Sequence, residues 1–167
     1  MPLAPEIWRA SAPGKVRYFA WLALHNRLWT ADRLRRRGID AHETCPLCGV
    51  APETLDHIFA ECAFTRQVWS RTMSMAGLPA APRSNSWLAA WDSWSANFSR
   101  PSRRGVVGLF LLITWTIWKE RNGRVFNASL TTPAALSSTI RDEVREWGRA
   151  GYKHNVELWT ASSNTIL

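Results

Sequence analysis

The cysteines of this chain are gathered in one short segment. All three cysteines and one of the four histidines lie between residues 45 and 62, with the spacing C-x2-C-x8-H-x4-C formed by Cys45, Cys48, His57 and Cys62. Thiolate sulfur and imidazole nitrogen are donors that a tetrahedral zinc ion prefers, and a C-x2-C pair can reach one metal from a single tight turn. The spacing therefore predicts one bound zinc ion. Because three cysteines and one histidine leave no open coordination position, we expect the zinc to be structural.

Two other interpretations of the cluster stay open. The thiols could be ordinary buried side chains, since free cysteine often packs as a small hydrophobic group. His42, three residues before Cys45, could replace His57 as the fourth ligand. The predicted ligand set also carries a geometric requirement, because His57 and Cys62 are five residues apart, which is about 140° around an ideal α-helix. The short helix expected from about Thr54 to Ala60 must therefore stop or bend before Cys62.

Hydrophobic periodicity predicts the fold class. Apolar residues recur at helical spacing through most of the chain, and no segment alternates in the manner of a strand. Helices are expected at about residues 16–28, 31–37, 54–60 and 64–75, from residue 87, and at about 104–122 and 133–150, while residues 124–127 are expected to be extended. The fold is therefore predicted to be mainly α-helical, with a small C-x2-C-x8-H-x4-C zinc lobe.

A connector at residues 78–85, which contains prolines, is the predicted boundary in the chain. It separates a zinc-binding domain at 1–77 from a helical segment at 86–151, which we expect to pack on or beside it, and residues 152–167 form a poorly patterned tail. The run Val106–Trp118 is apolar but has 13 residues, fewer than the roughly 20 that span a bilayer. Its basic flanks would suit an interfacial segment, although a buried core helix is the preferred interpretation, and no membrane partner is expected.

Positive charge is concentrated before the zinc lobe. The chain has a net charge of +8, which suits a polyanionic partner, and arginine can bind phosphate through two parallel hydrogen bonds. Between residues 27 and 37 one acid, Asp32, accompanies five arginines, and Arg33 and Arg37 share one helical face. The candidate RNA- or DNA-binding residues are Arg27, Arg33, Arg35, Arg36, Arg37 and Lys15. The alternative is a solvated helix end, where cations favour the helix dipole. Arg100, Arg103 and Arg104 could extend the surface.

Tryptophan is also abundant, with 11 residues in the chain. Trp87, Trp91 and Trp94 form one stripe of a helix, and core packing is preferred to a role as a stacking platform for bases. With all three cysteines assigned to zinc, none is left for a disulfide, which favours a nuclear or cytoplasmic location. The first ten residues show no apolar run behind a basic start, so a secretory signal is not expected.

The four predicted zinc ligands belong to a longer set of residues that resembles a known family. Together with Trp8, Pro13, Lys15, Phe19, Trp21, Asn26, Arg27, Leu28, Thr30, Leu34, Arg37, Gly38, Glu53, Phe59 and Trp69, they resemble the reverse-transcriptase zinc-binding domain. That domain follows the polymerase in plant LINE-type retroelements and occurs in stand-alone plant proteins derived from them. The resemblance covers roughly residues 6–75, and Ile117–Asn122 followed by Phe126 is similar to a segment that often trails the domain. It implies a zinc module of a retroelement-derived protein, with the four residues at the ligand positions.

Catalytic residues of a retroelement enzyme are not visible in the sequence. A reverse transcriptase needs adjacent aspartates to hold two catalytic metals, whereas each aspartate here stands singly. We therefore expect a non-enzymatic structural-zinc module that associates with RNA or DNA through its arginine-rich segment. The alternative is a zinc-stabilised protein-interaction or scaffold module, which the abundance of tryptophan and the tail residues Tyr152, Leu158 and Trp159 would suit.

Overall fold

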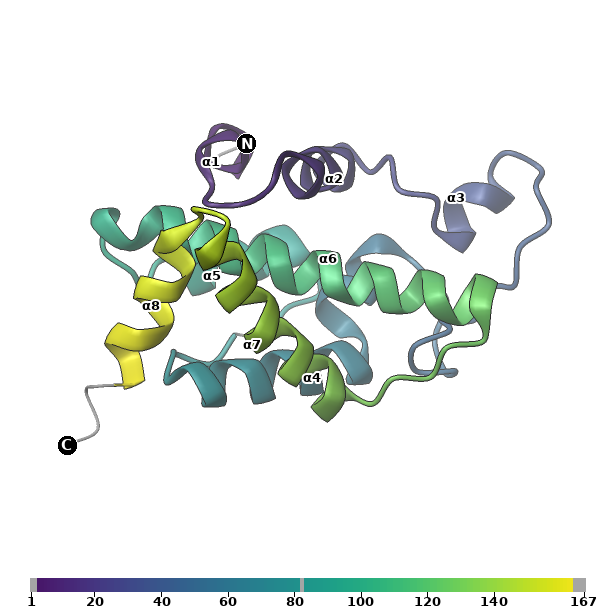
Figure 1. The fold of residues 1–167 in the computed structure, drawn as a ribbon. Helices are drawn as coiled ribbons and strands as arrows, with labels where there is room; N and C mark the ends of the chain where they lie inside the picture. The colour runs from purple at the N-terminus through teal and green to yellow at the C-terminus, as the bar shows by residue number, and fades with distance from the viewer. Residues whose placement is uncertain (1–2, 82, 164–167) are drawn as a thin grey trace.

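The computed structural model describes the backbone of residues 3–81 and 83–163 and the side chains of these ranges as far as residue 159. The helices are α1 (Leu3–Arg9), α2 (Gly14–Leu24), α3 (Ala31–Arg35), α4 (Ala63–Ala76), α5 (Trp87–Ser95), α6 (Arg103–Asn127), α7 (Pro133–Arg149) and α8 (Lys153–Ser163), with a π-helical turn η1 (His57–Glu61) and a 3-10 turn η2 (Arg100–Ser102) (Figure 1). Within the described ranges there is no strand beyond an isolated bridge between Thr44 and Pro52. The predicted mainly α-helical class is confirmed.

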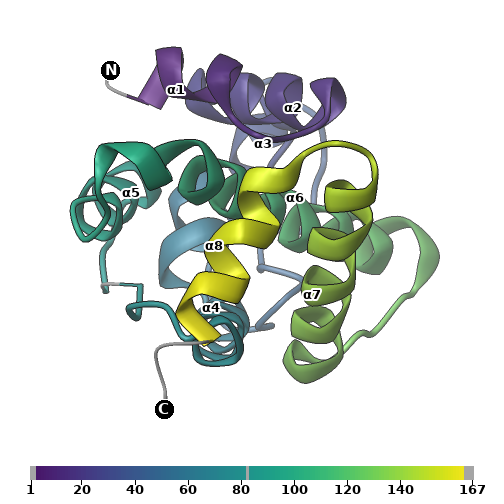
Figure 2. The same cartoon turned by 60° about the vertical axis from the view of Figure 1, so that its left-hand side comes forward.

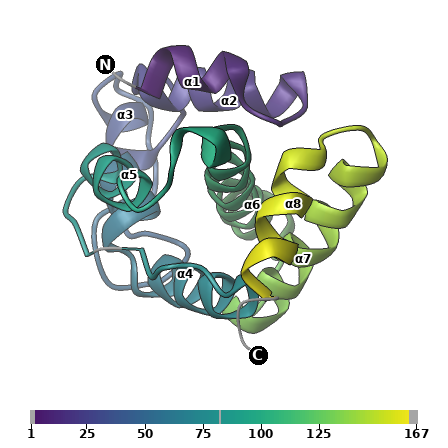
Figure 3. The same cartoon turned by 90° about the vertical axis from the view of Figure 1, so that its left-hand side faces the viewer.

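Helix α6 is the element on which the others pack. Figure 3 shows α6 in the middle of the fold, surrounded by other helices. In this view α1 and α2 lie above it, α5 to its left, α4 below it, and α7 and α8 to its right. The apolar run Val106–Trp118 lies inside α6, and its side chains are buried around nearly the whole circumference. A helix that is apolar all round must be covered all round. The run is therefore a core helix, and none of the helices in the described part of the chain is long and apolar enough to cross a membrane.

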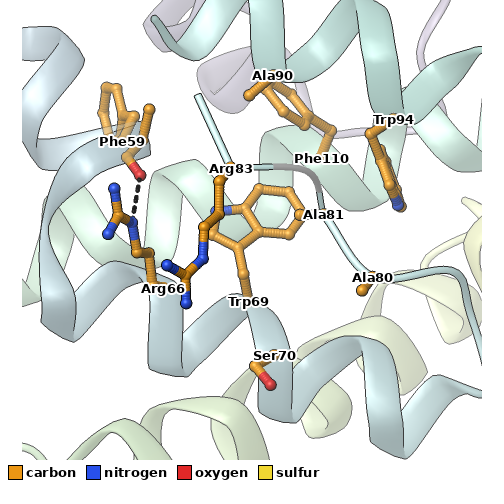
Figure 4. A pocket seen from close by; sticks show the side chains of 11 residues that line it. Phe59, Arg66, Trp69, Ser70, Ala80, Ala81, Arg83, Ala90, Trp94 and Phe110 are labelled. Atoms are coloured by element: carbon orange, nitrogen blue, oxygen red, sulfur yellow. Dashed lines mark hydrogen bonds between the residues drawn. The ribbon is translucent and has the colours of Figure 1, made fainter. Parts of the chain in front are cut away.

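The tryptophan stripe of α5 packs against this central helix. The rings of Trp87, Trp91 and Trp94 lie 6.1, 4.8 and 6.3 Å from the ring of Phe110, and Figure 4 shows Trp94 and Trp69 near the same phenylalanine. All three tryptophans are at most 4% exposed. The stripe is therefore core, as preferred from the sequence, and it has no free ring face to offer a base.

Helix α8 occupies residues whose sequence showed no pattern, and it lies beside α6 and α7 (Figure 2). Glycines of α6 allow this close approach, since a Cβ atom at Gly108 would lie 2.3 Å from Oδ1 of Asn155. The Asn155 side chain donates a hydrogen bond to the Ser11 carbonyl at 2.9 Å, which links α8 to the chain between α1 and α2. Contacts made 144 residues apart thus fix a helix that local periodicity does not predict.

Residues on both sides of the 78–85 connector contribute to one buried apolar cluster. Helix α4 packs on α7, and α2 packs on α6, so each pair joins the segment before the connector to the segment after it. The segment 86–151 thus lies directly against the first 77 residues. The division into domains at the connector stays a prediction.

Candidate metal centre

The first two cysteines lie on a tight turn that the backbone closes on itself. The Cys45 N–H donates to the Ala51 carbonyl at 2.8 Å, and the Gly49 N–H donates to the Cys45 carbonyl at the same distance. Gly49 has a φ of 68°, in the left-handed region that glycine adopts without steric cost. The turn brings Cys45 and Cys48 to one side of the loop between α3 and η1.

The other two residues of the cluster are placed by the wide turn η1. The Cys62 N–H donates to the His57 carbonyl at 2.8 Å, which is the i to i+5 bond of a π-helix. Widening the helix in this way brings Cys62, five positions after His57, back toward it, and Cys62 itself leaves the helix with ψ of 128°. The sequence required a stop or bend at this point, and the structure provides both.

Carbonyl groups loosened by the wide turn receive side-chain partners from α4. Arg66 Nε donates to the Ala60 carbonyl at 3.3 Å (Figure 4), and the Thr65 hydroxyl donates to the Ile58 carbonyl. Buried carbonyls without partners would be costly. These bonds stabilise the π turn of η1. A π turn is rare and is often found at functional sites.

The ligand atoms of Cys45, Cys48, His57 and Cys62 all lie within 4.8 Å of one another. Cys48 Sγ and His57 Nε2 are 3.3 Å apart. A tetrahedral zinc ion with Zn–S bonds of about 2.3 Å needs sulfur atoms about 3.8 Å apart, so the donor set and its spacing fit zinc. His42, the alternative ligand, is exposed and lies outside this cluster.

The two buried cysteines of the cluster differ in protonation. A hydrogen bond from the Cys45 thiol lowers the pKa of Cys62 to about 5 despite burial, with help from the N–H groups of Phe64 and Thr65 at the start of α4. The same interaction and burial raise the pKa of Cys45. His57 turns Nε2 toward Cys48, while Nδ1 lies 3.9 Å from Glu61 Oε2, on the opposite edge of the ring. A thiolate is the form that binds metal, so Cys62 is already in that form near neutral pH, whereas Cys45 must lose its proton when a metal binds.

Arg124 connects the cysteine turn to the end of α6. Its Nη1 donates to the carbonyls of Pro46 and Leu47, both at 3.1 Å, and its guanidinium lies 4.6 Å from the centre of the Phe64 ring. Residues 124–127 were expected to be extended, and that expectation is wrong. Helix α6 continues to Asn127, and Arg124 bonds both Glu120 one turn earlier, at 2.8 Å, and the cysteine turn.

Replacing Arg124 by methionine is expected to weaken zinc binding roughly 10- to 100-fold, the range typical for groups that orient metal ligands from outside. Methionine keeps the apolar stem near Phe64 but removes both bonds to the turn between the cysteines. Competition with a chelator of known affinity measures the change. The control is Lys119→Met on the same helix, whose ammonium pairs with Glu143 of α7. Equal zinc affinities for the two variants would contradict the positioning role.

A buried ion pair joins the zinc lobe to both α3 and α6. Arg121 Nε and Nη2 donate to the two carboxylate oxygens of Glu53 at 2.9 and 2.6 Å, and the side chains are 6% and 1% exposed. The same carboxylate accepts the Ala31 N–H at 2.7 Å, at the start of α3. Glu53 and Arg121 are both among the residues that resemble the family, but the sequence did not indicate that they form a pair. The available signal for the pair was that an acid and an arginine occur in the two segments that resemble the family.

Glu120 is a second buried acid at this end of α6. Burial works against its ionisation, but hydrogen bonds from Arg124 and from the Thr131 N–H lower its pKa overall. The Thr131 bond is 2.9 Å long and ties the segment after α6 back onto the helix. Glu120, Arg121 and Asn122 are thus engaged in ion pairs and hydrogen bonds within the chain.

The candidate nucleic-acid-binding residues fall into two places. Arg27, Arg35, Arg36 and Arg37 are exposed, and Arg33 is half-buried, around α3. Arg33 and Arg37 hold their guanidinium groups 5.3 and 5.0 Å from the centre of the Trp29 ring. Lys15 is exposed in the first turn of α2, so the length of that helix, about 15 Å, separates it from the arginines.

The three arginines proposed to extend the surface lie elsewhere. Arg103 begins α6 and pairs with Glu6 at 3.8 Å, and Arg104 Nε donates to the Arg9 carbonyl at 3.2 Å. Arg121, beside α3, is 18 residues further along the helix, or roughly 27 Å. Arg100 precedes them in η2. The basic surface around α3 is therefore separate from the start of α6 (Figure 1).

Comparison with known proteins agrees with this geometry. Residues 2–69 match the family described as zinc-binding in reverse transcriptase. The chain is 23% identical over 169 aligned residues to a provisionally named ribonuclease H protein of Arabidopsis thaliana, and the alignment covers 96% of this chain and 24% of that relative. The chain thus spans about a quarter of that protein's length, and no solved structure matches it significantly. The match to this zinc-binding family thus covers residues 2–69, and the candidate metal cluster lies within the matched segment.

Proposed function

We propose that the chain is a non-catalytic module in which zinc, held by Cys45, Cys48, His57 and Cys62, stabilises a surface that associates with RNA or DNA. The observation that carries this proposal is the anchoring of α3. Glu53 lies between the two halves of the metal cluster in sequence, and its carboxylate holds the start of α3 through Ala31. The zinc lobe thus positions the helix whose exposed arginines would contact phosphate.

The charges around α3 support an anionic partner. Arg35 pairs with Glu43 at 2.7 Å and Arg36 with Asp32 at 3.2 Å, but such exposed pairs are worth at most about 1 kcal/mol. Arg27, Arg33 and Arg37 form no ion pair with the described residues. Phosphate contacts can therefore form here without breaking a strong interaction within the chain.

The matched family is a zinc-binding domain and not a catalytic one, which supports a non-enzymatic role. The Arabidopsis thaliana relative is named for ribonuclease H, but this chain covers 24% of it. We propose that the named activity lies in other parts of that relative. We also propose a nuclear or cytoplasmic location, because the three thiols need a reducing compartment to stay available to zinc.

Replacing Arg35, Arg36 and Arg37 together by serine is expected to weaken binding to mixed-sequence RNA and single-stranded DNA at least tenfold. Each lost phosphate contact lowers the slope of log affinity against log salt by about 0.7 for single strands, so the slope should flatten by up to about 2. Fluorescence anisotropy over a range of salt concentrations measures both quantities. Lys15→Ser is expected to have a smaller effect because Lys15 lies apart from α3.

The matched control removes three arginines from α7: Arg141, Arg145 and Arg149. It makes the same change in net charge on another helix, so an equal loss of affinity would show non-specific attraction and contradict the proposed surface. Absence of nucleic-acid binding in the wild-type protein would favour the protein-interaction alternative. The tail gives that alternative little support, because the Tyr152 ring lies 6.2 Å from Trp147, and Leu158 and Trp159 pack against the core.

A further inference from the structure

A large hollow lies beside the zinc lobe, between α3 and the last turns of α6. Its volume is about 1320 Å³. The floor is mainly apolar and includes Leu22, Leu28, Leu34 and Trp118. Two acids line it, of which Glu53 is neutralised by Arg121, while Asp40 is exposed. The hollow is much larger than the 250 Å³ pocket between η1, α4 and α5 that Figure 4 shows.

Large apolar side chains stand exposed around this hollow. Phe126 is 74% exposed and Trp29 is 47% exposed, and Ile39 and Val125 are each nearly half exposed. These residues come from two different parts of the chain, the α3 region and the end of α6. A contiguous apolar patch of this kind usually marks a binding surface.

Guanidinium groups without an acidic partner among the described residues border the same patch. Arg27 lines the hollow, and Arg33 and Arg37 lie over the ring of Trp29, which also lines it. The arginines of α3 that do have acidic partners are Arg35 and Arg36. The positive charge without a described acidic partner is therefore next to the exposed aromatic rings: Phe126 is largely open, and Trp29 is half exposed with two guanidinium groups over its ring.

We infer that this hollow binds the unpaired bases of single-stranded RNA or DNA, with Trp29 and Phe126 stacking on bases and Arg27, Arg33 and Arg37 contacting the adjoining phosphates. The inference rests on the proposed nucleic-acid binding and adds the strandedness of the ligand and the stacking residues. Aromatic rings interleaved with cations bind single strands because every base has a ring face. A duplex hides those faces in its own base stack, so it could engage the arginines but not the rings.

The test compares a fluorescein-labelled 12-nucleotide oligouridine with a blunt RNA duplex of 12 base pairs. We expect the single strand to bind at least tenfold more tightly. Phe126→Ala and Trp29→Leu should each weaken its binding roughly tenfold or more and leave the salt dependence unchanged, since neither residue carries charge. The control is Tyr18→Ala, an aromatic that is 56% exposed on α2 and is not part of the hollow. It should bind as the wild type does.

The outcomes separate the two proposals. Zinc content and circular dichroism of each variant first establish that it is folded, and the high exposure of Phe126 makes that variant the safer one. Equal binding of single strand and duplex, together with wild-type affinity of both aromatic variants, would overturn the inference and leave the arginine surface standing. Competition by an acidic, leucine-rich peptide as effective as that of oligouridine would also overturn it. If neither nucleic acid binds, both proposals fail.

Discussion

Replacing Cys48 by serine is expected to abolish stoichiometric zinc binding and to unfold residues 39–62. A structural site of this type contributes on the order of 10–16 kcal/mol of apparent binding free energy, which is comparable with the 5–15 kcal/mol that stabilises a typical whole domain. The segment contains no regular element between α3 and η1, so it has no helical backbone ladder to hold it once the metal is lost. Zinc content by elemental analysis and amide hydrogen exchange by mass spectrometry measure the two effects. Chelation of the wild-type protein should reproduce both.

The control for this prediction is His42→Ala, which changes an exposed histidine outside the cluster and should retain zinc. Exchange should stay slow in α6 and α7, since Ile113, Ile117 and Ile140 are fully buried in the apolar core. A Cys48→Ser protein with one equivalent of zinc and wild-type exchange in the loop would refute the metal assignment.

Replacing Glu53 by glutamine is expected to lower the free energy of unfolding by about 3–5 kcal/mol, the usual cost of breaking a buried ion pair by removing one partner. The change leaves the Arg121 guanidinium charged at 6% side-chain exposure. It also weakens the acceptor for the Ala31 N–H, so α3 should exchange faster. Urea denaturation measures the loss, and hydrogen exchange locates it.

Glu43→Gln is the matched control, because it breaks an exposed pair with Arg35 and should cost less than about 1 kcal/mol. Changing both buried partners, as Glu53→Leu with Arg121→Met, should recover part of the loss, since an apolar pair leaves no unpaired charge. If the two glutamine variants lost the same free energy of unfolding, burial of the Glu53–Arg121 pair would make no contribution to stability.

These contacts also show that the matched family segment is not self-contained. Glu53 needs Arg121, and the carbonyls of Pro46 and Leu47 accept bonds from Arg124, both from a helix more than 50 residues away. The end of α6 thus serves as a support for the zinc lobe and as one wall of the hollow beside α3. Mutations there should affect the metal site and the proposed binding surface together.

Local sequence was sufficient to predict a helix where the apolar pattern and the end residues of that helix define it. Helix α4 ends at Gly77, whose φ of 66° suits glycine. Helix α7 begins behind Thr132, whose hydroxyl accepts the Ala135 N–H at 3.2 Å. The apolar stripe of α7 and the tryptophans of α5 face the core as their spacing predicts. In each case the determining residues lie within about one helical turn of the feature.

Tertiary contacts decided the rest. The last turn of α6 is tied to the cysteine turn by the bonds of Arg124 to the Pro46 and Leu47 carbonyls, and α8 is tied to the chain before α2 by Asn155 reaching Ser11. No window of sequence contains both partners of such a contact, so neither could be predicted. The sequence by itself predicted which four residues form the metal cluster and that the helix must break before Cys62. Only the tertiary structure decided that this break is a π turn. It also decided that Glu53, Arg121 and Arg124 join the cluster to α3 and α6, because the hydrogen bonds of these three side chains link residues about 20 to 80 positions apart.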